Sequence, residues 1–138
     1  MTGQRVRSGF LHLQPHASVH SGPETPEDML NRPVGFFPLT GEDERTVFVA
    51  KEQVLAVTLA GEPLFDDPDR IHAARTTGLR IELSDGSELV GTAALELPPT
   101  RSRALDFLNE GSGFFAIHAL EVVHLVNRRQ IRLVTSLD

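Results

Sequence analysis

Residues 104–117 read ALDFLNEGSGFFAI, and residues 26–39 read PEDMLNRPVGFFPL. Aligned without a gap at an offset of 78 residues, the two stretches share six identical residues. The identities pair Asp28 with Asp106, Leu30 with Leu108, Asn31 with Asn109, Gly35 with Gly113, Phe36 with Phe114 and Phe37 with Phe115. Two flanking stretches match in the same order: LHLQP (11–15) with LELPP (95–99), and AKEQVLAV (50–57) with NRRQIRLV (127–134) after a one-residue slip. The sequence therefore predicts an internal duplication.

The second copy shows its secondary structure more clearly. Apolar residues alternate with polar ones over 79–83, which predicts a half-buried strand, and Asp85-Gly86 predicts a two-residue hairpin turn. The return strand contains Gly91, a residue that suggests a bulge or sharp bend, and ends before Pro98-Pro99. A short helix and three further strands follow, so each copy is predicted to have the element order β-β-α-β-β-β.

Four short motifs are expected to have structural roles, and two of them, the Asn residues and the Phe pairs, occur in both copies. Asn31 and Asn109 fall where the short helices end, and Asn tolerates the left-handed backbone conformation that terminates many helices. In the first copy, Thr25-Pro26-Glu27-Asp28 is a typical helix start. The pairs Phe36-Phe37 and Phe114-Phe115 begin the next strands, with at least one ring of each pair expected in the core. A tight turn is expected at Asn127-Arg128-Arg129.

We therefore expect a mainly β fold with short helices (α+β), in which two tandem repeats of a small, strongly bent, barrel-like unit pack pseudo-symmetrically. The predicted organisation is a degenerate first repeat over 1–60, a linker over 61–78 and a second repeat over 79–138. The first copy has too few residues before Gly9 for the first strand of the unit. Its sheet should therefore be completed by the second repeat, or by another chain through strand addition.

Composition narrows the class of protein. The chain has 138 residues, 40% of them hydrophobic, and no Cys, which excludes disulfides and thiol chemistry. No apolar run approaches the roughly 18 residues of a membrane helix, and the first residues lack the apolar core of a secretion signal. We expect a cytoplasmic protein without a membrane partner.

Charge bears on nucleic-acid binding. The formal net charge is −6, with −5 over residues 1–70 (6 basic, 11 acidic) and −1 over 71–138 (7 basic, 8 acidic). An acidic chain is a poor match to polyanions, because phosphate neutralisation supplies much of the affinity for nucleic acid. The second half nevertheless concentrates arginines, and these are the candidate nucleic-acid ligands: Arg101, Arg103, Arg128, Arg129 and Arg132.

Other candidate chemistry is sparse. His12, His16 and His20 stand four residues apart, a spacing that could hold zinc or nickel on a helix, but Pro15 and the alternation around His12 indicate a strand and loop. The chain has no phosphate-binding glycine loop and no known hydrolase or metalloprotease motif. We expect no enzymatic activity and no cofactor, with a metal or small-ligand sensor as a lesser alternative.

The second copy also resembles an uncharacterised family of small bacterial β-domains. The resemblance lies in Leu105–Asn109 (LDFLN), in the Phe114-Phe115 pair, and in Val126-Asn127-Arg128 followed by Ile131. The first copy departs from this pattern, with Ala50 where the second has Asn127. Because this family is uncharacterised, the resemblance suggests no particular activity and no catalytic residue.

The layout is similar to Sm-like small β-barrels, which implies a strongly bent sheet, ring assembly and RNA binding, although here the helix follows the second strand. Two hypotheses result. The first is a non-enzymatic protein-interaction, scaffold or regulatory module that binds a protein partner or a second copy of itself. The second is an Sm-like nucleic-acid-binding protein that uses the five arginines.

Overall fold

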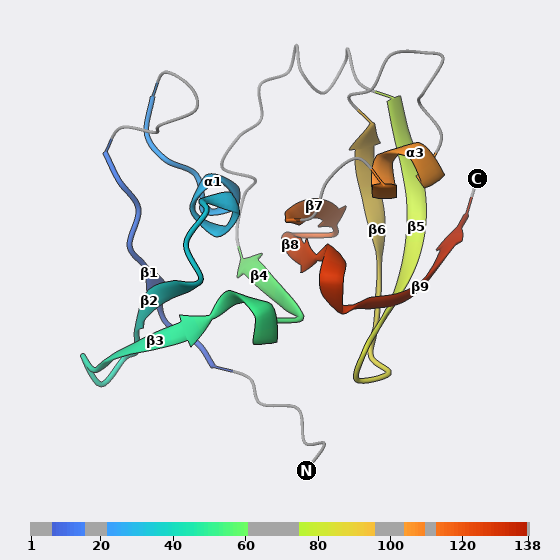
Figure 1. Ribbon diagram of the computed structural model, residues 1–138. Coiled ribbons are helices and arrows are strands. Elements are labelled where there is room, and N and C mark those ends of the chain that lie inside the picture. Colours follow the sequence, from blue (N-terminus) through green and yellow to red (C-terminus); the bar gives the residue numbers. More distant parts are fainter. Residues whose placement is uncertain (1–6, 16–21, 61–74, 96–103, 110–112, 138) are drawn as a thin grey trace. The chain divides into compact units, whose positions relative to one another are not determined.

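The computed structural model describes residues 7–15, 22–60, 75–95, 104–109 and 113–137 (Figure 1). The chain divides into two compact units, residues 1–54 (unit 1) and residues 55–138 (unit 2). Both units are mainly β, with few and short helices, as the sequence predicts.

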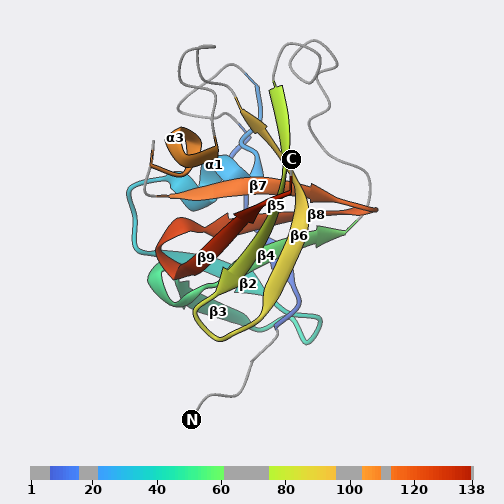
Figure 2. The ribbon, with the colours of Figure 1, turned by 90° about the vertical axis from the view of Figure 1, so that its right-hand side faces the viewer.

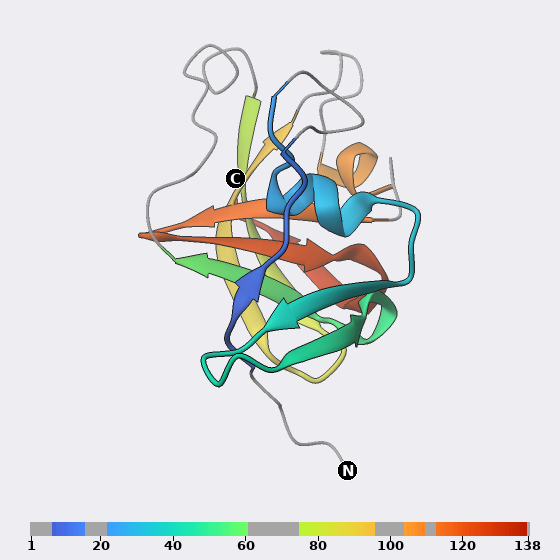
Figure 3. The ribbon, with the colours of Figure 1, turned by 90° about the vertical axis from the view of Figure 1, so that its left-hand side faces the viewer.

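Unit 1 contains a three-stranded antiparallel sheet with the order β1-β2-β3. Its elements are β1 (Phe10–Leu11), α1 (Pro26–Asn31), β2 (Phe36–Thr40), β3 (Thr46–Ala50) and the 3-10 turn η1 (Lys51–Gln53). Figure 3 shows α1 and the β2–β3 hairpin that follows it.

The start of α1 agrees with the sequence signals. Thr25 accepts a hydrogen bond from the Asp28 amide, and Asp28 accepts one from the Thr25 amide, which completes a capping box with Pro26 at the first turn. The helix ends at Asn31 as predicted, but the predicted left-handed terminator is wrong: among the described non-glycine residues, positive φ angles occur at Glu44 and Glu121. The chain instead leaves α1 through an extended Arg32, because Pro33 disfavours a helical conformation in the residue before it.

Unit 2 contains a six-stranded antiparallel sheet with the order β4-β8-β7-β6-β5-β9. The strands are β4 (Ala56–Ala60), β5 (Arg75–Leu83), β6 (Glu88–Leu95), β7 (Phe114–Ala119), β8 (Val122–Asn127) and β9 (Ile131–Ser136), with α3 (Ala104–Asn109) after β6 and the 3-10 turn η3 (Arg128–Gln130) before β9. From β5 onward this is the predicted β-β-α-β-β-β order. The sheet ends at β4 and β9, so it is not a closed barrel.

The sheet bends sharply where β6 meets β7. In Figure 2, β7 and β8 run across the view whereas β5 and β6 run steeply, and β6 and β7 share one paired position, Thr92 with His118. A Cβ atom at Gly91 would lie 2.7 Å from the His118 carbonyl oxygen and would collide with the Ile117 side chain. The pairing of β5 with β6 keeps its register across Gly91, so no bulge occurs there, and close approach of a neighbouring strand is the reason for glycine at this position.

Among the described residues of unit 2, seven buried apolar side chains form a core cluster. Its buried members are Leu79, Ile81, Leu83, Ala93, Phe115, Ile117 and Val126. The prediction of one buried ring per Phe pair is confirmed, because Phe37 is 4% exposed and Phe114 and Phe115 are 4% and 3% exposed.

Two local predictions need correction. The stretch 61–78 is not all linker, since β5 begins at Arg75; residues 61–74 lie outside the described residues. The turn at Asp85-Gly86 is also longer than two residues. Leu83 accepts a bond from the Gly86 amide and donates one to Ser87, so three residues form the loop and Gly86 takes φ of 89°.

Candidate strand-addition interface

The edge strand β4 joins its sheet by antiparallel pairing with β8. Five residue pairs run from Ala56 opposite Val126 to Ala60 opposite Val122. The Asn127 amide extends this ladder by donating to the Leu55 carbonyl at 3.1 Å. The strand therefore adds to a sheet whose other strands come from residues 75–136 of the sequence.

One polar pair crosses this junction. Thr58 lies directly opposite His124, and the Thr58 hydroxyl oxygen is 2.8 Å from the His124 Nδ1 atom. Burial lowers the pKa of His124 below its usual value, because the imidazolium form loses solvation there. The β4–β8 junction is thus favoured when His124 is neutral.

The opposite edge of the sheet, β9, pairs with β5 on one side and has no strand partner among the described residues on the other. The Leu137 amide donates to the Gly78 carbonyl at 2.9 Å. Because backbone groups alternate in direction along an antiparallel strand, those of Val134 and Ser136 point away from β5. Leu133 on β9 and Leu137 just after it are 57% and 47% exposed, so apolar side chains lie along an edge that no described strand covers.

The outer strand of unit 1, β3, presents a similar edge. It pairs with β2, and the described part of the chain supplies no strand on its other side. The Lys51 amide donates to the Gly35 carbonyl at 2.9 Å, so by the same alternation the backbone groups of Phe48 and Thr46 point away from β2. The Phe48 side chain is 74% exposed.

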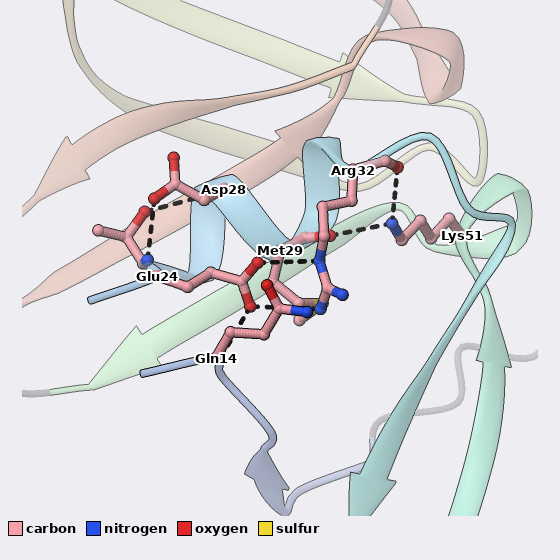
Figure 4. Close-up of polar contacts among 7 residues, drawn as sticks. Gln14, Glu24, Asp28, Met29, Arg32 and Lys51 are labelled. Carbon is pink, nitrogen blue, oxygen red and sulfur yellow. Dashed lines mark hydrogen bonds and ion pairs between the residues drawn. The ribbon is translucent and has the colours of Figure 1, made fainter. Parts of the chain in front are cut away.

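A buried lysine holds the end of α1 in unit 1 (Figure 4). The Lys51 Nζ donates to the carbonyl oxygens of Met29 at 2.9 Å and Arg32 at 3.1 Å. Burial lowers the pKa of Lys51, the Arg32 charge lowers it further, and Glu24 acts in the opposite direction. Glu24 is itself 3% exposed, forms a 2.9 Å ion pair with the Arg32 Nε, and accepts a bond from the Gln14 amide. These charged groups therefore hold backbone in place.

An arginine occupies the corresponding place in unit 2. The Arg128 guanidinium lies 5.1 Å from the ring centre of Phe107 and 4.7 Å from that of Phe115, and the two rings meet edge to face. Its Nη2 atom also donates to the Phe107 carbonyl at 3.5 Å. Arg128, at the start of η3, is thus half-buried against rings of α3 and β7, where cation–π attraction stabilises it.

The other predicted nucleic-acid ligands lie elsewhere. Arg129 is exposed in η3, and Arg132 is exposed on β9, where its Nε is 3.5 Å from the Glu82 carboxylate. Arg101 and Arg103 lie outside the described residues. The predicted turn at Asn127 is present as η3, and the Asn127 side chain accepts a hydrogen bond from the Arg129 amide at 3.1 Å.

The histidines do not form a metal site among the residues that the structure describes. The His12 Nε2 atom lies 2.6 Å from the Thr40 hydroxyl, and His16 and His20 fall outside the described residues. Within the described ranges, no three metal-ligating side chains gather.

Three features were missed from the sequence: the structural role of Lys51 and the exposure of Phe48 and of Phe36. The alignment of AKEQVLAV with NRRQIRLV already placed Lys51 opposite Arg128, so its structural role could have been inferred. The exposure of Phe48 had no such signal, because it depends on β3 being an outer strand. Phe36 is likewise 62% exposed although its partner Phe114 is buried.

No protein-family model, curated protein or solved structure matches the chain. Among the described helices, none is long and apolar enough to cross a membrane.

Proposed function

We propose that this chain is a cytoplasmic, non-enzymatic protein-interaction or scaffold module, made of two tandem copies of a small, strongly bent Sm-like β-unit. In this proposal the module engages other polypeptides by strand addition at its sheet edges. The observation that carries it is β4, which already adds to the edge of the β8 strand.

Matching strand register supports the tandem copies. In unit 1, Phe36 pairs with Ala50, and in unit 2, Phe114 pairs with Asn127. A 3-10 turn follows each of these hairpins, and its first amide donates to the glycine that precedes the Phe pair: Lys51 to Gly35, and Arg128 to Gly113. These are equivalent positions in the sequence alignment.

The basic residue of each 3-10 turn supports the same proposal. Lys51 donates to the carbonyl of Met29, and Arg128 donates to the carbonyl of Phe107. Met29 and Phe107 are aligned positions in α1 and α3. A side-chain contact between aligned residues is a stronger indication of duplication than shared strands, because many small β-proteins share strands alone.

The alignment also equates β4 with β9, since each follows its 3-10 turn. The last strand of the first copy thus lies beside the penultimate strand of the second copy, and the compact units divide at residue 54 rather than at 60. This arrangement is strand addition between copies. It leaves β9, the last strand of the second copy, with a free edge of the same kind.

The buried ionisable groups support a non-enzymatic role. In unit 1, buried Lys51 donates to the Met29 carbonyl and buried Glu24 accepts from the Gln14 amide, whereas half-buried His124 contacts Thr58 across a strand pair. Each has a structural partner that explains its burial.

Site-specific photo-crosslinking in cells tests the proposed function. A photoreactive amino acid at Leu133, on the free edge of β9, should form adducts with polypeptide. The same photoreactive amino acid in place of Leu105, which is 63% exposed on α3, is the control and should not give those adducts.

Adducts with nucleic acid at Leu133, or equal protein adducts at both positions, would contradict the proposal. The nucleic-acid alternative has its own signature, which is salt-dependent binding of labelled RNA or DNA that weakens in the Arg129→Ala and Arg132→Ala variants.

A further inference from the structure

We propose that the partner of the β9 edge is the β3 edge of a second copy of this chain, paired in the register that β4 and β8 use within one chain. This inference rests on the proposed function and names the partner for the same site. Each copy would offer β9 to one neighbour and β3 to another.

The in-chain junction supplies the register. Val57 pairs with Leu125, and Leu59 pairs with Val123. In the alignment of the two copies, Val57 and Leu59 correspond to Val134 and Ser136 of β9, whereas Leu125 and Val123 correspond to Phe48 and Thr46 of β3. If β9 pairs with β3 of a second copy as β4 pairs with β8, Val134 therefore lies opposite Phe48 and Ser136 lies opposite Thr46.

The hydrogen-bonding directions agree with this register independently. The ladder bonds of β9 to β5 and of β3 to β2 leave the backbone groups of Val134, Ser136, Phe48 and Thr46 pointing outward. The positions that the register pairs are thus the positions whose amide and carbonyl groups are directed to the free edges. A shift by one residue would set the outward-facing backbone groups of one strand opposite inward-facing groups of the other.

The side chains fit as well. Phe48 is 74% exposed, but Leu125, its counterpart at the in-chain junction, is 1% exposed. The register also sets the exposed Leu133 opposite Val49, so two apolar residues meet there. Addition of β9 would remove apolar surface from water at both edges, which favours association.

The predicted interface is head to tail, because two different strands meet. A heterologous contact of this kind generates a closed ring or an open filament rather than a symmetric dimer. Because the two edges differ, two variants that are each blocked at a different edge should still bind one another. A symmetric contact would not give this result.

The experiment measures mass by light scattering coupled to size-exclusion chromatography, over a wide range of protein concentrations. Wild-type protein should form species larger than a monomer, and their share should rise with concentration. Phe48→Glu, which blocks the β3 edge, and Leu133→Glu, which blocks the β9 edge, should each be monomeric. Leu120→Glu is the control, because Leu120 is 91% exposed at the turn between β7 and β8, which are inner strands of their sheet; it should assemble like the wild type.

Mixing the two blocked variants gives the decisive result. The Phe48→Glu copy keeps its β9 edge and the Leu133→Glu copy keeps its β3 edge, so the mixture should contain one-to-one dimers and nothing larger. A mixture that stays monomeric, or a Phe48→Glu protein that assembles like the wild type, would overturn the proposal. The second outcome, combined with a monomeric Leu133→Glu protein, would indicate a symmetric β9–β9 contact.

Hydrogen exchange on the wild-type protein is a second test, and it does not depend on whether the substituted proteins fold. The amides of Val134 and Phe48 should exchange more slowly at high concentration than at low concentration. Rates independent of concentration contradict self-association. A monomeric wild type that still gives protein adducts at Leu133 would refute this inference and leave the proposed function standing, whereas the loss of both results would refute both.

Discussion

Replacement of Arg128 by Ala separates a structural arginine from a nucleic-acid ligand. The guanidinium lies about equally close to two rings, 5.1 Å from Phe107 and 4.7 Å from Phe115 at their centres. A cation–π contact contributes about 0.5–1 kcal/mol at an exposed site and about 2 kcal/mol when desolvated. For a half-buried arginine between two rings we expect a loss of about 1–2 kcal/mol. The 3.5 Å hydrogen bond to the Phe107 carbonyl is at the limit of a useful bond and adds little.

The assay is urea unfolding followed by circular dichroism, since the chain has no Trp and no Tyr for fluorescence. Each kcal/mol lost lowers the urea midpoint by about 0.3–1 M, because small proteins have urea m-values of about 1–3 kcal/mol/M. Arg129→Ala is the matched control, because Arg129 is the exposed neighbour and should leave the midpoint unchanged. An Arg128→Ala protein of unchanged stability that loses salt-dependent RNA or DNA binding would refute the structural role.

Three further outcomes follow from the geometry. Gly91→Ala should destabilise unit 2 by about 1–3 kcal/mol, because its new Cβ would lie 2.7 Å from a backbone carbonyl oxygen. Gly35→Ala is the control and should be tolerated, since a Cβ there meets nothing within 4 Å. Equal urea midpoints for the two variants would contradict the close approach at Gly91. Phe37→Ala should cost about 3–5 kcal/mol and Phe36→Ala far less, since the rings are 4% and 62% exposed; thermal unfolding compares them, and a similar loss from both would mean that Phe36 is also buried in solution. Burial lowers the pKa of His124, so the unfolded chain takes up its proton at higher pH than the folded one, and the stability that neutral His124 supports is present above its ordinary pKa and lost below it. Wild-type protein should therefore lose more stability than His124→Gln between about pH 8 and about pH 5, and parallel losses in urea titrations would contradict this.

Local signals in the sequence determined the elements of this protein. Thr25, Pro26 and Asp28 begin α1 because their side chains and ring satisfy the first turn of a helix without help from the rest of the chain. Gly86 marks the β5–β6 turn for a similar reason, since its positive φ is a local requirement. Local patterns likewise predicted the β-β-α-β-β-β order from β5 onward, and Pro33 accounts for the end of α1 at Asn31.

Tertiary structure decided how these elements are paired and which side chains are left exposed. The sequence of β4 is compatible with several neighbours, and its place beside β8 joins Val57 to Leu125, far apart in the chain. The sequence also did not distinguish Phe36 from Phe114, which occupy equivalent positions but differ in burial. Strand partners and burial depend on contacts between residues that are distant in sequence, and a strand carries little local information about which edge it will join. The free edges of β3 and β9, on which the proposed interactions depend, were therefore visible only once the sheets were known.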